Sequence, residues 1–217
     1  MSILIDQTTA VLVQGITGKE GSRAAHEMLA YGTAVLAGVT PGKGGMKTEE
    51  GVPVYDTVAE ALLRHPEISA SVIFVPGKSV MIAVEESITA RIPLIVIVSE
   101  RVPVADVSRI IALGKEAGVR IVGPSSVGII SPDKGKIGSI GSSGLATRIF
   151  ARGPIGVVSK SGGMTSEISR ILTEQGLGQS TALGIGGDPL LGSSFLDVAL
   201  LFEKDPETKA IVLFGEV

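Results

Sequence analysis

The sequence predicts an α/β protein in which parallel strands are covered by helices. Two observations carry this prediction. Short runs rich in Val and Ile, such as Leu94–Val98, are apolar throughout, which suits strands buried on both faces of a sheet. Longer segments of helical period separate these runs, and strands that alternate with helices indicate a doubly wound arrangement.

The first 124 residues show this alternation most regularly. In Val104–Ala117, for example, apolar side chains recur at near-helical spacing, and Gly118 follows as a stop signal. We expect strands in five runs (Ala10–Val13, Thr33–Gly38, Ser71–Val75, Leu94–Val98 and Val119–Val122) and helices in four segments (Lys19–Ala30, Thr57–Arg64, Val80–Ala90 and Val104–Ala117).

The composition changes after this part of the chain. From Gly123 to about Pro154 the sequence is rich in Ser, Gly and Pro, which we interpret as a crossover between two domains, residues 1–124 and 125–217. Because the sequence ends directly after a strand, we expect the second domain to be truncated at its C-terminus. Its predicted elements are the strands Ile155–Ser159, Thr181–Ile185 and Ala210–Phe214 and the helices Gly163–Gln175 and Ser193–Glu203.

Composition excludes several classes of function. A net charge of −3 and 3% aromatic residues, with no Trp, argue against nucleic-acid binding, and the absence of Cys excludes thiol catalysis and disulfides. The N-terminus lacks a signal peptide, and no apolar run approaches the ~20 residues that cross a bilayer. We therefore expect a soluble, cytoplasmic protein without a membrane partner. His26 is expected on a helix face and His65 on the surface, so we predict no metal site.

A glycine loop follows the first predicted strand. Gly15, Gly18 and Gly21 form the pattern G-x-x-G-x-x-G before a helix, and such a helix start offers backbone N–H groups and a positive dipole end to an anion. The spacing differs from the G-x-G-x-x-G of dinucleotide enzymes, and Glu20 after Lys19 excludes a Walker A loop. Alternatively, the glycines serve only a tight turn and close helix packing.

The second strand disfavours NAD. An NAD site has an acidic residue near the end of this strand, and the sequence Leu36–Gly45 contains none. Lys43 lies there instead and could meet a phosphate, which leaves NADP or coenzyme A with its 3′-phosphate; the alternative is a solvated lysine. The sequence Val98-Ser99-Glu100 ends the fourth strand at the same sheet edge, where Glu100 could accept hydrogen bonds from a ligand or merely lead into a helix.

The second domain carries two more glycine-rich helix starts. These are Ser159–Glu167 and Gly184–Phe195, and Glu216 follows the last strand. Together they predict a second site for phosphate or carboxylate at one sheet edge, unless Ser161 or Thr165 is only an N-cap. From the residues alone, the chain is expected to bind phosphorylated ligands at two places and to lack an evident reactive group.

Several long motifs resemble one family. Gln14–Gly21, Val39–Gly45, Met1–Asp6, Gly184–Phe195 and Phe202–Pro206 are similar, in order, to the α subunit of succinyl-CoA synthetase (succinate–CoA ligase, NDP-forming), and the resemblance covers the whole chain. It implies a Rossmann-like CoA-binding domain followed by a flavodoxin-like parallel α/β domain. It also implies an enzyme of the tricarboxylic acid cycle, in which Mg-NTP on an ATP-grasp β subunit phosphorylates an α-subunit histidine. The phosphohistidine activates succinate as an acyl phosphate, which CoA attacks as a substrate.

The resemblance also implies roles for individual residues. Ser161 and Gly162 would present a helix N-terminus to the phosphohistidine, and Glu216 would support its imidazole as a catalytic residue. The family's histidine follows Glu216 in a Gly-His-Ala-Gly motif, and the sequence ends at Val217, so we expect this chain alone to be inactive. The residues implied in CoA binding are Thr17, Gly18, Lys19, Glu20, Lys43, Val98, Ser99 and Glu100.

Two departures from the family pattern leave the acid substrate open. Ser166 stands where the family has a Tyr on the substrate side, and the turn Gly123–Gly128 lacks the family's Asn-Cys-Pro. Both changes resemble the ATP-citrate lyase and citryl-CoA synthetase branch, so malate or citrate are alternatives to succinate. A non-catalytic CoA-binding module and, less favoured, an NADP oxidoreductase remain further alternatives. The preference for ATP or GTP, an αβ or (αβ)2 assembly, and whether the native protein has a further C-terminal segment stay open.

Overall fold

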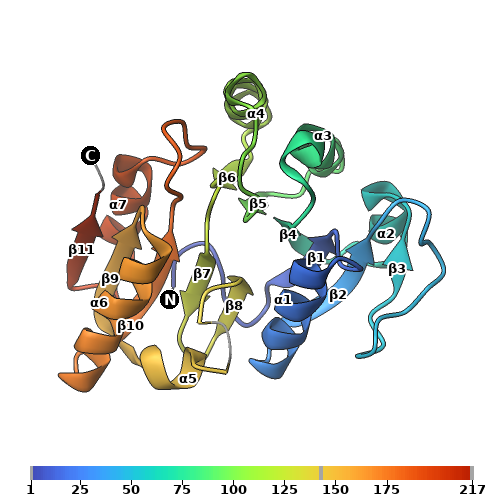
Figure 1. Ribbon diagram of the computed structural model, residues 1–217. Helices are drawn as coiled ribbons and strands as arrows, with labels where there is room; N and C mark the ends of the chain where they lie inside the picture. Colours follow the sequence, from blue (N-terminus) through green and yellow to red (C-terminus); the bar gives the residue numbers. More distant parts are fainter. Residues whose placement is uncertain (1, 142–143, 216–217) are drawn as a thin grey trace.

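The computed structural model, which describes residues 2–141 and 144–215, contains two β-sheets that lie side by side (Figure 1). The first sheet has six parallel strands in the order β3-β2-β1-β4-β5-β6, the doubly wound order of nucleotide-binding folds. Its strands are β1 (Ala10–Gln14), β2 (Ala34–Val39), β3 (Val54–Tyr55), β4 (Ile68–Ile73), β5 (Leu94–Ile97) and β6 (Arg120–Val122).

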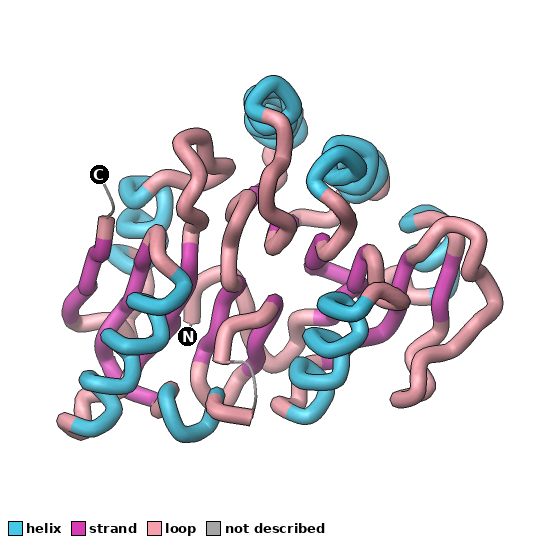
Figure 2. The backbone as a smooth tube through the Cα atoms, viewed as in Figure 1, coloured by secondary structure: helices cyan, strands magenta, loops and turns pink. Residues whose placement is uncertain are grey.

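Helices cover both faces of this sheet, as the tube in Figure 2 shows. Alternate side chains of β1 point to opposite faces: Val11 and Val13 pack in one core with α1, whereas Leu12 packs in another with α2. All four predicted helices are present, as α1 (Lys19–Ala30), α2 (Val58–Arg64), α3 (Val80–Thr89) and α4 (Val104–Ala117), with a short 3-10 turn η1 (Gly77–Ser79) before α3.

Two details of the first sheet differ from prediction. The two-residue strand β3 was not predicted, because it is too short for a periodic pattern. The strand predicted at Ser71–Val75 begins earlier, because Ile68 already pairs with Ala10, and it ends at Ile73. Phe74 and Val75 therefore belong to the loop at the carboxyl end of β4, next to the cavity described below.

The second sheet is mixed, in the order β11-β9-β10-β7-β8. Strands β9 (Arg152–Ser159), β10 (Gln179–Gly184) and β11 (Ala210–Phe214) are parallel, whereas β7 (Gly128–Ser131) and β8 (Gly135–Gly138) form an antiparallel hairpin beside β10. Helices α5 (Ala146–Ile149) and α6 (Gly162–Glu174) pack on one face, and α7 (Phe195–Glu203) packs on the other.

The predicted crossover from Gly123 to Pro154 is wrong, because this segment contains the β7–β8 hairpin and α5. The hairpin was not predicted from the composition, because the residues that pair at its ends are glycines. Gly128 pairs with Gly138, and both have positive φ angles of +106° and +94°. A Cβ atom on Gly128 would lie 1.9 Å from the carbonyl oxygen of Ile137, so the two strands approach closely only without side chains there.

The two sheets are connected by more than the chain between them. Lys136 of β8 is 1% exposed, and its Nζ lies 3.5 Å from a carboxylate oxygen of Glu27 on α1. Burial lowers the pKa of Lys136, and the charge of Glu27 opposes this shift. Thr33 Oγ1 donates to the Lys136 carbonyl (2.8 Å), and the N–H of Ile3 donates to Thr181 Oγ1 of β10 (3.3 Å). The domain boundary at residues 124 and 125 stays a prediction.

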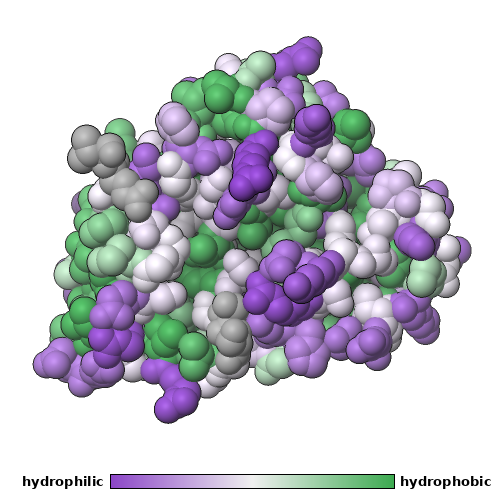
Figure 3. All heavy atoms as spheres, viewed as in Figure 1, coloured by the Kyte–Doolittle hydropathy of each residue, from purple (hydrophilic) through white to green (hydrophobic). Residues whose placement is uncertain are grey.

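The surface of α1 is polar on its outer side. Hydrophilic side chains gather over this helix in Figure 3. Lys19, Glu20 and Arg23 of α1 are exposed. Within residues 2–141 and 144–215, none of the helices has the length and apolar character to cross a membrane.

Candidate functional site

A cavity of about 430 Å³ opens at the carboxyl ends of β1, β2 and β4. Gly15 follows β1, Thr40 follows β2 and Phe74 follows β4, and all three line it, while α3 forms a further wall. Strands β1 and β4 are neighbours from which the chain winds in opposite directions. Such a switch point is where open α/β sheets bind ligands.

The glycine loop shapes one end of this cavity. Gly15 adopts a φ of +81°, and a Cβ atom on Gly21 would lie 2.2 Å from the Gly15 carbonyl oxygen. These two glycines therefore serve the tight turn and the close helix packing that the sequence left as an alternative. Gly18 is the N-cap of α1 and makes no side-chain capping bond, so the first-turn N–H groups of α1 are left for an anion.

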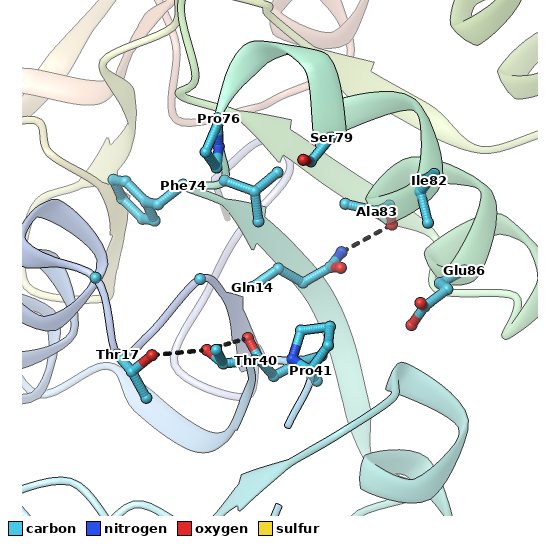
Figure 4. Close-up of a pocket in the computed structure, with 14 residues that line it drawn as sticks. Gln14, Thr17, Thr40, Pro41, Phe74, Pro76, Ser79, Ile82, Ala83 and Glu86 are labelled. Atoms are coloured by element: carbon cyan, nitrogen blue, oxygen red, sulfur yellow. Dashed lines mark hydrogen bonds between the residues drawn. The ribbon is translucent and has the colours of Figure 1, made fainter. Parts of the chain in front are cut away.

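Two of the predicted CoA-binding residues line the cavity. Gly18 does so at the start of α1, and Thr17 does so from the loop. Figure 4 shows the Thr17 hydroxyl beside that of Thr40, with an oxygen–oxygen distance of 3.2 Å. Lys19 and Glu20 are exposed in the first turn of α1 and lie outside the cavity lining.

The other predicted CoA-binding residues lie nearby without lining the cavity. Lys43 is exposed two residues after the lining Pro41, and its backbone N–H donates to Asp56 Oδ1 (3.0 Å). Ser99 is buried, and its hydroxyl donates to the Val75 carbonyl (2.6 Å). Its function in the structure is thus to hold the β4 loop against the β5 loop. Val98 is half-buried, and Glu100 is exposed.

Most of the cavity wall comes from residues that were not predicted from the sequence. Ile82 and Glu86 lie on α3, and Gln14 ends β1, its side chain pointing to the cavity in Figure 4. Glu86 Oε2 accepts from the N–H of Val58 (3.0 Å) and so caps α2 from a neighbouring helix. Only Gln14 carried a signal, because a polar residue ends an otherwise apolar run; Ile82 and Glu86 look like ordinary helix residues.

The predicted second site is partly closed. Ser161 is the N-cap of α6, and its hydroxyl accepts from the N–H of Met164 (3.3 Å). This is the alternative in which Ser161 caps the helix. Gly162 starts the helix, and a Cβ atom there would lie 2.2 Å from Val127 Cγ1, so the glycine allows α6 to pack against the β7 turn. Ser166 is half-buried on the second turn of α6.

The α7 start is not an open anion site, and this corrects the sequence-based expectation. Ser194 and Asp197 form a capping box, in which the Ser194 hydroxyl accepts from the Asp197 N–H (3.2 Å). Hydrogen bonds from Ser194, followed by the charges of Arg120 and Lys115, lower the pKa of the Asp197 carboxyl. A carboxylate of the chain itself therefore occupies this helix end.

The loop between β10 and α7 is held by the turn before β7. Ser126 Oγ donates to the Gly184 carbonyl (2.6 Å), and Ser125 Oγ donates to Asp188 Oδ1 (2.8 Å). Because β9 and β10 are parallel neighbours, this loop and the Ser161 turn lie at the same sheet edge. Glu216, predicted to support catalysis, lies outside the described residues.

Neither histidine lies at the cavity or at the Ser161 turn. His26 is exposed, and its Nδ1 lies 2.9 Å from Glu50 Oε1. His65, which was expected on the surface, is partly exposed: its side chain is 24% exposed and its Nε2 lies 3.2 Å from the Tyr55 hydroxyl. Across the part of the chain that the structure describes, no three His, Asp or Glu side chains are grouped as metal ligands.

Sequence comparisons identify related proteins. The model of the CoA binding domain matches residues 6–101, and that of CoA-ligase matches residues 158–217. Succinate–CoA ligase [ADP-forming] subunit alpha 2 of Archaeoglobus fulgidus is 48% identical over 217 residues, which cover 100% of this chain and 73% of that protein. The corresponding α subunit of Aquifex aeolicus is 47% identical, over 100% of this chain and 70% of its own length.

Solved structures show the same fold in larger proteins. ATP citrate lyase from Methanothrix soehngenii, determined with citrate and coenzyme A, superposes with a TM-score of 0.90 at 27% identity. The match covers 99% of this chain and 37% of the lyase. A dinucleotide-forming acetyl-coenzyme A synthetase from Ca. Korarchaeum cryptofilum shares the fold with a TM-score of 0.73 at 18% identity, over 96% of this chain and 44% of its own.

Proposed function

This chain belongs to the succinate–CoA ligase α-subunit family, and from that premise we propose that it binds coenzyme A at the cavity between β1 and β4. The observation that carries the proposal is the uncapped start of α1, where Gly18 offers no side chain to the first-turn N–H groups. Those N–H groups and the helix dipole suit a pyrophosphate. The apolar walls beside them suit the less polar parts of the same ligand.

The placement of Lys43 supports CoA over NAD. No acidic residue lies between Leu36 and Gly45 to hold the ribose hydroxyls of NAD. Lys43 is exposed on the loop after β2, which borders the cavity through Pro41. From there its ammonium group reaches toward the 3′-phosphate of CoA, while Lys19 and Glu20 flank the pyrophosphate and Val98, Ser99 and Glu100 border the thiol-bearing arm.

We further propose that the chain works as the α subunit of an NDP-forming ligase. Its partner is a β subunit of ATP-grasp fold that binds Mg-NTP, in an αβ or (αβ)2 assembly in the cytoplasm. The Ser161–Gly162 turn faces the phosphorylated histidine of the complete enzyme, and Glu216 orients that imidazole. Succinate is the first candidate acid, because the relatives at 47–48% identity are named for it.

A larger acid is the second candidate, and one observation favours it. Ser166 is a small, half-buried residue on α6, close in sequence to the Ser161 turn, and it leaves room for the extra group of malate or citrate. The ratio of kcat/KM for succinate, malate and citrate in the complete α–β enzyme tests this candidate. If Ser166→Tyr leaves that ratio unchanged, the residue does not line the acid site.

Calorimetric titration of the 217-residue chain tests the CoA site. We expect CoA to bind and NADPH not to bind; binding of NADPH without CoA would refute the proposal. Lys43→Ala is expected to weaken CoA by about fivefold and dephospho-CoA by less than about twofold, because a single exposed charge pair contributes up to about 1 kcal/mol. Equal losses for both ligands would mean that Lys43 does not recognise the 3′-phosphate.

A further inference from the structure

Gln14 is a buried amide at the base of the cavity, and the proposed function so far leaves it without a role. It is 3% exposed and ends β1, directly before the glycine loop. Its Nε2 lies within hydrogen-bonding distance of three acceptors: the Ala83 carbonyl (2.9 Å), Ser87 Oγ (2.9 Å) and Ser71 Oγ (3.1 Å). The side chain is therefore fixed between β1, β4 and α3.

This network determines which end of the amide faces the ligand. A backbone carbonyl only accepts hydrogen bonds, so the nitrogen of Gln14 must face Ala83 and the oxygen must face away from it. No donor among the described residues reaches Gln14 Oε1, although every hydrogen-bonding position of Nε2 is used. The amide thus presents a pre-oriented, unpaired acceptor to the cavity that Gln14 lines (Figure 4).

The cavity is electrically polar, and this orients an anionic ligand. The N-terminus of α1 at Gly18 attracts phosphate, whereas the carboxylate of Glu86 on α3 repels it. Pro41, Val75 and Ile82 contribute apolar surface to the same cavity. A ligand with phosphates at one end and a flat heteroaromatic ring at the other fits this arrangement when its ring lies on the side of Gln14 and Glu86.

We propose that Gln14 Oε1 accepts a hydrogen bond from the exocyclic amino group of adenine, so that Gln14 discriminates 6-amino from 6-oxo purines. The proposal rests on the proposed function, in which the cavity holds coenzyme A. A 6-oxo purine would place a carbonyl oxygen against Oε1 and leave this acceptor unpaired in the complex. Sites built around such a hydrogen bond reject analogues that lack the donor.

Binding of adenosine 3′,5′-bisphosphate and inosine 3′,5′-bisphosphate to the 217-residue chain tests this inference. The two share the ribose bisphosphate and differ in the 6-substituent and at the adjacent N1, which carries a hydrogen in inosine. We expect the wild-type protein to bind the adenosine compound at least about tenfold more tightly. Gln14→Met, which keeps the length of the side chain, should bring this ratio to within about twofold of one. Ser87→Ala, which removes one acceptor of Nε2 but leaves Ala83 and Ser71, should keep it.

The outcomes separate the inference from the proposed function. If CoA and both bisphosphates fail to bind, the CoA site itself is refuted. If CoA binds but the wild-type ratio is near one, only the role of Gln14 is overturned. It is also overturned if Glu86→Gln rather than Gln14→Met removes the discrimination. Should Gln14→Met not fold, the wild-type protein is titrated with the 3′,5′-bisphosphate of purine riboside, which has no substituent at position 6. If this compound binds as tightly as the adenosine compound, the hydrogen bond is refuted.

Discussion

The starts of α1 and α7 are both glycine-rich in sequence, yet only one is open to a ligand. Gly18 caps α1 without a side chain, whereas Ser194 and Asp197 close the first turn of α7 with a hydroxyl and a carboxylate. The start of α6 is intermediate, because Ser161 takes one N–H group. Glycine content therefore does not distinguish an anion site; the identity of the N-cap residue does.

Replacing Gly21 should break the α1 site with the largest effect. In Gly21→Ala the new Cβ would lie 2.2 Å from the Gly15 carbonyl oxygen, so the loop and the helix must separate. We expect a loss of about 2–3 kcal/mol in the free energy of unfolding and at least a tenfold loss of CoA affinity, measured by denaturation and calorimetry.

Gly163→Ala is the matched control for Gly21→Ala. Gly163 lies in the first turn of α6, where a Cβ atom would be 4.0 Å from the nearest atom, Ser161 Oγ. The free energy of unfolding of this variant should rise by about 0.5–1 kcal/mol, because alanine favours helix more than glycine does. Its affinity for CoA should equal that of the wild type. Similar losses in both variants would contradict the role assigned to the Gly15–Gly21 contact.

Giving α1 the kind of cap that closes α7 is a sharper test of the comparison. Gly18 has φ −79° and ψ 157°, a conformation that any residue adopts, although its Cβ would lie 3.2 Å from the Gly15 carbonyl oxygen. In Gly18→Asp the carboxylate would bind the first-turn N–H groups and repel phosphate. We expect CoA affinity to fall about tenfold while the free energy of unfolding stays within about 0.5 kcal/mol. Unchanged affinity would mean that the ligand phosphates lie elsewhere.

Removing the α7 cap should have the smallest effect and leave binding unchanged. Ser194→Ala should lower the free energy of unfolding by about 1 kcal/mol at neutral pH. Ser194 holds the pKa of Asp197 below its ordinary value of 3.8, so the stabilisation is present above that pH and is lost as the pH falls through the folded-state pKa. The difference between variant and wild type should therefore be constant above about pH 5 and shrink as the pH falls below about 4. A difference that grows on acidification would contradict this assignment.

The sequence predicted the fold where each element is long or apolar. The helices α1 and α4 were predicted with their observed bounds, and for α4 the stop signal was Gly118. The β7–β8 hairpin was missed because Gly128 and Gly138 act through a pairing between segments that no local pattern reveals.

The candidate site was predictable only in its loop. Thr17 and Gly18 belong to a contiguous motif, and both line the cavity. Ile82 and Glu86 line the cavity because α3 lies close to β1 in the folded chain, and their sequence neighbourhood looks like that of an ordinary helix. Gln14 carried only the signal of a polar residue at the end of an apolar run. The closed start of α7 was misread for a related reason: the capping pair Ser194 and Asp197 outweighs the glycines that precede it.

The burial of Lys136 makes the two halves of the chain depend on each other during unfolding. Its ammonium group lies beside Glu27 of the other half, and Ile3 at the N-terminal end donates to Thr181 of the second sheet. If the halves separated, Glu27 would lose its Lys136 partner and the apolar core shared by α1 and β7 would meet water. The protein should therefore melt in one cooperative transition, and a fragment cut between β6 and β7 would lose part of its own core rather than fold as an autonomous module.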